Sequence, residues 1–241
     1  MDFDNPAYRL LTLLQEGKNI DASISCQEAW AHLLGVHVNS PELYARLGKV
    51  MELPAQAVSA LRFSYPDESD TWSHWVSQVQ RGFQKQALNQ PWSGFIGHID
   101  SHTINFLKVH SRLLQVKSKL KPLDSDVLGD ARAGLSEVLD LLLNAEEMDR
   151  EVRSALSRNI RKLINAIEEY KLTGSVGIFD AIEILCGHAH FDKKYGRELN
   201  SGEIGDKLSA IVGGLADSMT IALGLPQVSD SVKALIAYAS S

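Results

Sequence analysis

Apolar residues recur at intervals of three and four positions through most of the chain, which is the spacing of one face of a helix. The first example lies near the start, where Asn5-Pro6 precedes four leucines between residues 10 and 14. Asparagine is favoured as an N-cap and proline at the first helical position, and Gly17 then interrupts the pattern. The pattern predicts a short helix that ends near Gly17.

Further short helices are predicted before residue 60. Ser25 and Glu28 have the spacing of a capping box, in which each side chain accepts from the other residue's backbone N–H. Ser40-Pro41 repeats the cap-and-proline start, and Pro54 is expected to begin another short helix. We therefore expect residues 1–90 to form an N-terminal module of short helices.

Residues 91–121 predict one long helix that carries three histidines. Its projection places His110 inside an apolar stripe and His102 at the edge of that stripe. Burial of Phe106 is expected because Phe106 belongs to this stripe. The stripe consists of Phe95, Ile99, Phe106, Leu113 and Leu120.

Longer helical patterns follow Pro122. One opens near Asp124, the next covers about residues 147–172 and ends at Thr173-Gly174, and no segment makes a convincing strand. Short connections between long helices are typical of antiparallel bundles. The predicted fold is all-α, with the short-helix module of residues 1–90 packed on a bundle of longer antiparallel helices over residues 91–241.

The composition of the chain limits the class of protein and the cellular compartment that we expect. The 241 residues are 44% hydrophobic and 22% charged, which is ordinary for a folded globule. The formal net charge of -6 opposes general attraction to nucleic acid. Only Cys26 and Cys186 occur, and the acidic N-terminus has no apolar core. We expect a reduced, cytoplasmic protein without a signal peptide or membrane anchor.

Histidine spacing raises the question of a metal site. His98 and His102 are four positions apart, so both imidazoles can lie on one side of a helix, whereas Asp100 points away from them. A second candidate pair, His188 and His190, lies near an expected helix end. Structural histidines are the favoured interpretation, and no cofactor is expected. A transition metal serving a hydrolase or nuclease is the alternative.

Two groups of residues are candidates for binding a partner. Trp72 and Trp75 could form a recognition surface, although an aromatic core is the commoner use of such a stripe. Arg153, Arg158 and Arg161 could contact RNA or another protein, although a solvated helix face is the default. The chain has no phosphate loop, GxGxxG, HExxH or GxSxG motif, which disfavours an enzyme.

Small residues repeat every fourth position between residues 205 and 222, with Gly213 and Gly214 at the centre. Such a ridge lets another backbone approach closely. Residues 203–224 could therefore insert into a membrane or self-associate. A packed helix of the bundle is favoured instead, because Asp217 and Pro226 oppose a stable membrane span.

Three segments, NPAYRLLTLLQEG, PWSGFIGHIDSHTINFL and LINAIEEYKLTG, resemble stretches of all-helical bacterial accessory proteins encoded near anti-phage defence genes. The resemblance covers about a sixth of the chain and includes no catalytic motif. It implies a bacterial accessory role and assigns no functional residue.

Together these observations predict a non-enzymatic protein-interaction or regulatory component of a bacterial cytoplasmic system. Its expected partner is another protein or a second copy of itself in a homo-oligomer, recognised through helix faces. A nucleic-acid partner is not favoured, because the basic run from Lys108 to Lys121 lacks interleaved aromatic residues. A membrane-acting effector is the first alternative function, and a metal-dependent hydrolase or nuclease is the second.

Overall fold

The computed structural model describes residues 3–68, 70–118 and 121–223. The elements found there are helices, together with one isolated bridge between Ser25 and Pro91. The predicted all-α class is thereby confirmed. The chain divides into two compact units, Met1–Leu120 (unit 1) and Lys121–Ser241 (unit 2). This division falls later than the predicted boundary at residue 90, because the helix before Leu120 packs on the N-terminal helices.

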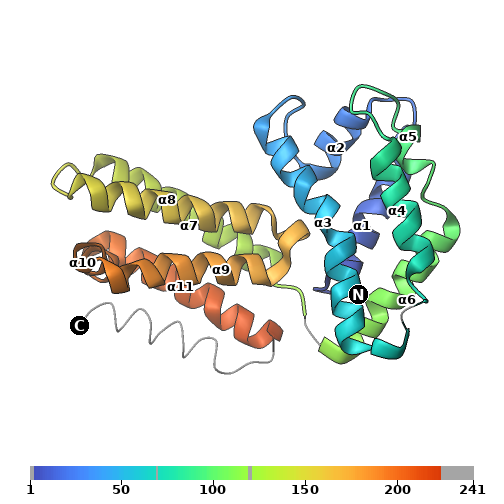
Figure 1. Cartoon of the computed structure of the whole chain (residues 1–241). Helices are drawn as coiled ribbons and strands as arrows, with labels where there is room; N and C mark the ends of the chain where they lie inside the picture. The colour runs from blue at the N-terminus through green and yellow to red at the C-terminus, as the bar shows by residue number, and fades with distance from the viewer. Residues whose placement is uncertain (1–2, 69, 119–120, 224–241) are drawn as a thin grey trace. The chain divides into compact units, whose positions relative to one another are not determined.

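Unit 1 is built around its first helix, α1 (Pro6–Lys18), which contacts α2, α3, α5 and α6 (Figure 1). All four leucines of α1 are buried. The other elements of the unit are α2 (Cys26–Leu34), α3 (Pro41–Ser64), the 3-10 turn η1 (Pro66–Glu68), α4 (Ser73–Lys85), α5 (Ser93–Ile96) and α6 (Ser101–Ser118).

The helix starts predicted at Asn5, Ser25 and Ser40 are confirmed by their caps. The Asn5 side chain accepts from the backbone N–H of Tyr8, and the Ser25–Glu28 capping box is complete. The prediction that a helix begins at Pro54 is wrong, since Pro54 lies inside the continuous helix α3. An interior proline removes one backbone hydrogen bond. Here Pro54 is buried beside Leu53, so packing offsets that loss.

The single long helix predicted over residues 91–121 is also wrong, because the chain turns between α5 and α6. The Asp100 carboxylate accepts from the backbone N–H of Thr103 at 2.6 Å and so caps the start of α6. The turn leaves Phe106 40% exposed, contrary to expectation, whereas His110 is buried as predicted. The buried side of α6 consists of Thr103, Leu107, His110, Ser111 and Leu114.

All four tryptophans lie in the core of unit 1. Trp30 packs edge-on against Trp92 and Phe95, with ring centroids 4.9 Å apart in both pairs. Trp72 and Trp75 lie on either side of the start of α4 and are buried as well. Trp72 and Trp75 therefore do not form the recognition surface considered above. They belong to an aromatic core, which was the alternative.

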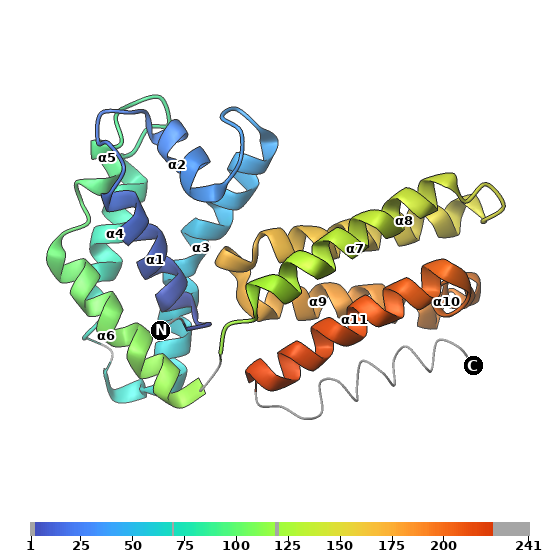
Figure 2. The same ribbon diagram turned by 180° about the vertical axis from the view of Figure 1, so that it is seen from behind.

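Within residues 121–223, unit 2 has four long helices that run alternately out and back, and one short helix lies between the last two of them (Figure 2). α7 contacts α8 and α11, and α8 contacts α9. Their facing sides form one apolar core. The helices are α7 (Ser125–Asn144), α8 (Arg150–Glu168), α9 (Tyr170–Phe191), α10 (Lys193–Asn200) and α11 (Gly202–Leu223).

Gly174 interrupts α9 with φ 67° and ψ -165°, a conformation essentially restricted to glycine. The break predicted at Thr173-Gly174 is therefore present. The preceding helix ends earlier than expected, at Glu168, and one helical turn from Tyr170 leads into the break.

Candidate functional site

The histidines of the HIDSH segment do not converge as a pair. His98 lies in the turn between α5 and α6 and is half-buried, whereas His102 is exposed in the first turn of α6. Instead, Asp100 pairs with His74 of α4, with 3.1 Å between His74 Nε2 and Asp100 Oδ2. The His102 ring lies edge-on to the His74 ring, with centroids 6.2 Å apart.

Sequence reasoning missed His74 as a member of this cluster. Asp100 itself could have indicated the turn. Aspartate is a favoured N-cap, and its side chain accepts from a backbone N–H in the first turn of the helix that follows. Hydrogen bonds outweigh the partial burial that disfavours ionisation of Asp100, so the pKa of this carboxyl is lowered. Among the described residues, no group of three or more histidine, cysteine or acidic side chains is arranged to hold a metal ion.

His188 and His190 lie in the last turn of α9 and do not face a common point. The His188 ring packs edge-on against Tyr195 of α10, with centroids 4.5 Å apart, and the His190 ring contacts Phe191. Tyr195 is buried, accepts from Asn159 and donates to the carbonyl of Leu185. His188 thus contributes to packing between α9 and α10.

His110 is the histidine most completely enclosed by its neighbours. Trp75 Nε1 donates to His110 Nδ1 at 3.1 Å, so this nitrogen carries no proton. His110 Nε2 lies 3.1 Å from the hydroxyl of Thr71, which itself donates to the carbonyl of Glu68. The ring is a neutral link between α6, α4 and η1. Burial lowers the pKa of His110 below its ordinary value.

The three candidate arginines of α8 differ in environment. Arg153 is half-buried and donates to the carbonyl of Ala145 at 3.1 Å, which ties α8 to the preceding loop. Arg158 and Arg161 are exposed on the outer side of α8. The structure therefore leaves Arg158 and Arg161 on a solvated face and gives Arg153 a local structural contact.

Gly213 and Gly214 do not mediate a close helix contact in the described part of the chain. A Cβ atom added at either glycine would meet no atom within 4 Å. The tight approach in α11 occurs at Gly205, where a Cβ would lie 2.9 Å from the Leu199 carbonyl oxygen. No helix within residues 3–68, 70–118 and 121–223 has both the length and the apolar character to cross a membrane.

An exposed apolar face runs along α9 after Gly174. We call it the α9 face and define it by Val176, Asp180, Glu183, Ile184, Gly187 and Phe191, which recur at the three- and four-residue spacing of one helix side, with Glu183 and Ile184 adjacent. Val176, Ile184 and Phe191 are 64%, 44% and 88% exposed. A shallow hollow of about 570 Å³ lies along its second half, from Asp180 to Phe191. Large apolar side chains grouped on one side of a helix commonly mark an interaction site.

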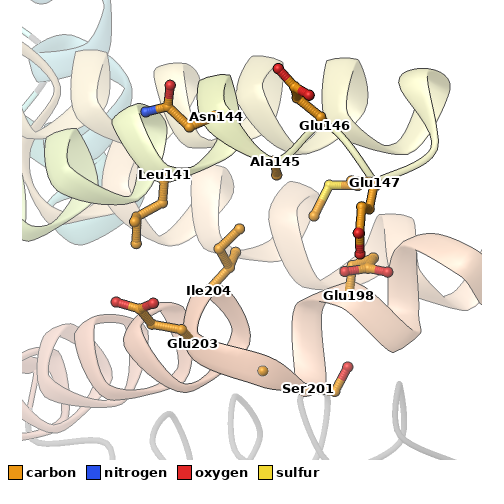
Figure 3. Close-up of a pocket in the computed structure, with 11 residues that line it drawn as sticks. Leu141, Asn144, Ala145, Glu146, Glu147, Glu198, Ser201, Glu203 and Ile204 are labelled. Carbon is orange, nitrogen blue, oxygen red and sulfur yellow. The ribbon is translucent and has the colours of Figure 1, made fainter.

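A pocket of about 720 Å³ lies at the end of unit 2 where α10 leads into α11 (Figure 3). Its half-buried floor includes Leu141, Met148 and Ile204. Glutamates come from both sides, Glu146 and Glu147 from the α7–α8 loop and Glu198 and Glu203 from α10 and α11. None of the lining residues is basic. Phe191 precedes the start of α10, whereas Glu198 near the end of α10 lines the pocket, so α10 lies between the two features.

No protein-family model, curated protein or solved structure shows significant similarity to this chain.

Proposed function

We propose that this protein is a non-enzymatic binding component that recognises a helical segment of a partner protein through the α9 face. The observation that carries the proposal is the exposure of Val176, Ile184 and Phe191 along one side of a single helix. Amphipathic helices bind in this way, with apolar side chains repeated at three- and four-residue spacing as anchors.

The apolar part of the α9 face supplies the driving force. Phe191 leaves 88% of its surface in water, so a partner that covers it removes a large apolar area from solvent. The hollow between Asp180 and Phe191 gives an incoming side chain a recess beside the ring. Buried aromatic anchors of this kind commonly dominate the energy of an interface.

The charges of the α9 face define the chemistry of the partner. Asp180 and Glu183 are exposed and have no ion-pair partner in the described residues. Complementary charge favours encounter and suppresses wrong partners. The partner segment should therefore be a helix that carries apolar residues flanked by lysine or arginine.

Synthetic peptides test this proposal without knowledge of the natural partner. Fluorescence anisotropy would compare a helical peptide with lysines beside an apolar stripe, the same peptide with glutamates for lysines, and a third with serines for the apolar residues. We expect the basic, apolar peptide to bind at least about tenfold more tightly than either of the others.

Variants locate the binding site. Phe191→Ser and Asp180→Lys should each weaken binding of the basic peptide. Phe63→Ser is the matched control, because Phe63 is 93% exposed on unit 1 and lies outside the α9 face. Equal binding of all three peptides, or equal loss with Phe63→Ser, would overturn the proposal. A bacterial, defence-associated setting stays a prediction from the resemblance alone.

A further inference from the structure

α6 has an exposed face whose chemistry is the reverse of that on α9. We define the α6 face by Lys108, Val109, Arg112 and Val116. Val109 and Val116 are 52% and 71% exposed, and both basic residues are exposed beside them. α6 contains no acidic residue. Neither Lys108 nor Arg112 forms an ion pair within the parts of the chain that the structure describes.

The two faces also match in spacing. In an antiparallel pair with Arg112 opposite Asp180, Val116 is level with Val176, since both helices rise by about 1.5 Å per residue. Val109 then comes within about one residue of Ile184, and Lys108 within about one residue of Glu183.

The same register also determines which α6 residue lies opposite the hollow in the α9 face. Phe106, 40% exposed at the edge of the α6 face, comes within about one residue of Gly187. Gly187 is one of the residues that line the hollow and has no side chain to fill it. The register therefore places apolar residues opposite apolar residues and a large ring beside the recess.

We propose that the partner segment recognised by the α9 face is α6 of a second copy of this chain. This inference rests on the proposed function and names its partner. Opposite charges beside an apolar seam fix partner choice and orientation in paired helices. Because the two surfaces differ, a two-fold dimer would contain the contact twice. A head-to-tail arrangement would close into a ring or leave one α6 face and one α9 face open for a further copy.

Sedimentation equilibrium of the full chain tests self-association over about 1 μM to about 1 mM protein. We expect the mean mass of the wild type to rise with protein concentration. This rise should be smaller at high salt, because salt screens exposed charges. Arg112→Glu and Asp180→Arg should each weaken association at least about tenfold, because each places two like charges opposite one another. Arg161→Glu and Asp130→Arg reverse exposed charges outside both faces and should leave association unchanged.

Mixing the two defective variants gives the decisive measurement. In the mixture, unaltered Arg112 of one variant can meet unaltered Asp180 of the other, so association should return to within about threefold of the wild type. Circular dichroism of each variant checks that the loss does not come from unfolding.

Each contrary outcome overturns the inference. A wild type that stays monomeric at every concentration excludes the second copy as partner, and no recovery on mixing excludes the α6–α9 pairing. Association that the control variants weaken equally belongs to another surface. If any of these results is obtained while the basic peptide still binds and Phe191→Ser abolishes its binding, the proposed function stands and only the choice of partner is wrong.

Discussion

The indole N–H of Trp75 donates to Nδ1 of His110 at 3.1 Å and thereby sets the protonation state of the buried imidazole. A protonated ring would carry N–H groups on both nitrogens, so Nδ1–H would face the indole N–H. The ring contacts Trp72, Trp75 and Phe106. Burial lowers the pKa of His110 more than the backbone of Phe106 and the carboxylate of Glu68 together raise it.

Acidification should therefore destabilise unit 1. The folded pKa of His110 lies below the ordinary value of 6.5, so the unfolded chain binds more protons in this range. The stabilisation is fully present above about pH 6.5 and is lost as the pH falls towards the folded pKa, by at most about 1.4 kcal/mol per pH unit. Denaturation between pH 7.5 and 5 measures this loss.

His110→Gln is the control for the pH effect. Glutamine can accept from Trp75 and donate to Thr71 without titrating. Its unfolding free energy should fall less steeply with pH than that of the wild type. An identical slope in both proteins would show that other groups cause the acid sensitivity.

Leu107 and Phe106 should contribute very differently to stability although they are neighbours in α6. Leu107 is fully buried, so Leu107→Ala should cost about 2–5 kcal/mol. Phe106→Ala should cost about 1 kcal/mol, because the ring is 40% exposed. Urea denaturation followed by circular dichroism compares the two, and a larger loss for Phe106→Ala would mean that the buried side of α6 is misassigned.

Asp100 should act mainly as a helix cap. Asp100→Ala should cost about 1 kcal/mol, because the N–H of Thr103 loses its acceptor at the start of α6. Asp100→Asn keeps an acceptor and loses only the charge opposite His74, a pair that is exposed enough to contribute little. We expect the asparagine variant to stay within about 0.5 kcal/mol of the wild type in the same denaturation measurement. Equal losses in both variants would assign the effect to the ion pair.

Two glycines of α11 should respond oppositely to alanine. Gly205→Ala brings a Cβ within 2.9 Å of the Leu199 carbonyl oxygen, so we expect a loss of about 1–3 kcal/mol. Gly213→Ala meets no atom within 4 Å and should stabilise the helix by about 0.5–1 kcal/mol. Thermal unfolding measures both. Destabilisation by Gly213→Ala would mean that another chain segment packs on this glycine.

Local signals in the sequence predicted the fold class and several boundaries. Asn5, Ser25 and Ser40 each cap a helix through a side chain and a backbone N–H three residues apart, so neighbouring residues decide the outcome. The break at Gly174 is similarly local, because only glycine adopts that backbone conformation readily. By contrast, the local signal at Pro54 predicts a helix start that the structure does not have, because Pro54 is buried within the continuous helix α3.

The candidate sites were harder to predict because they depend on packing. Asp100 reads as one more residue of a periodic helix until its carboxylate is known to cap Thr103 and to contact His74. α9 carries apolar residues on nearly all sides after Gly174, so its sequence does not reveal which side faces water. The exposure of Ile184 and Phe191 follows only from where α8, α10 and the core lie against that helix.

The confinement of all four tryptophans to the core of unit 1 gives the intact chain a built-in optical reporter. Indole emission shifts when buried rings meet water, so tryptophan fluorescence should follow the opening of unit 1 alone. Circular dichroism at helix wavelengths records both units together. The two signals, measured in one denaturant titration, would separate if the units unfold independently and would coincide if they unfold as one.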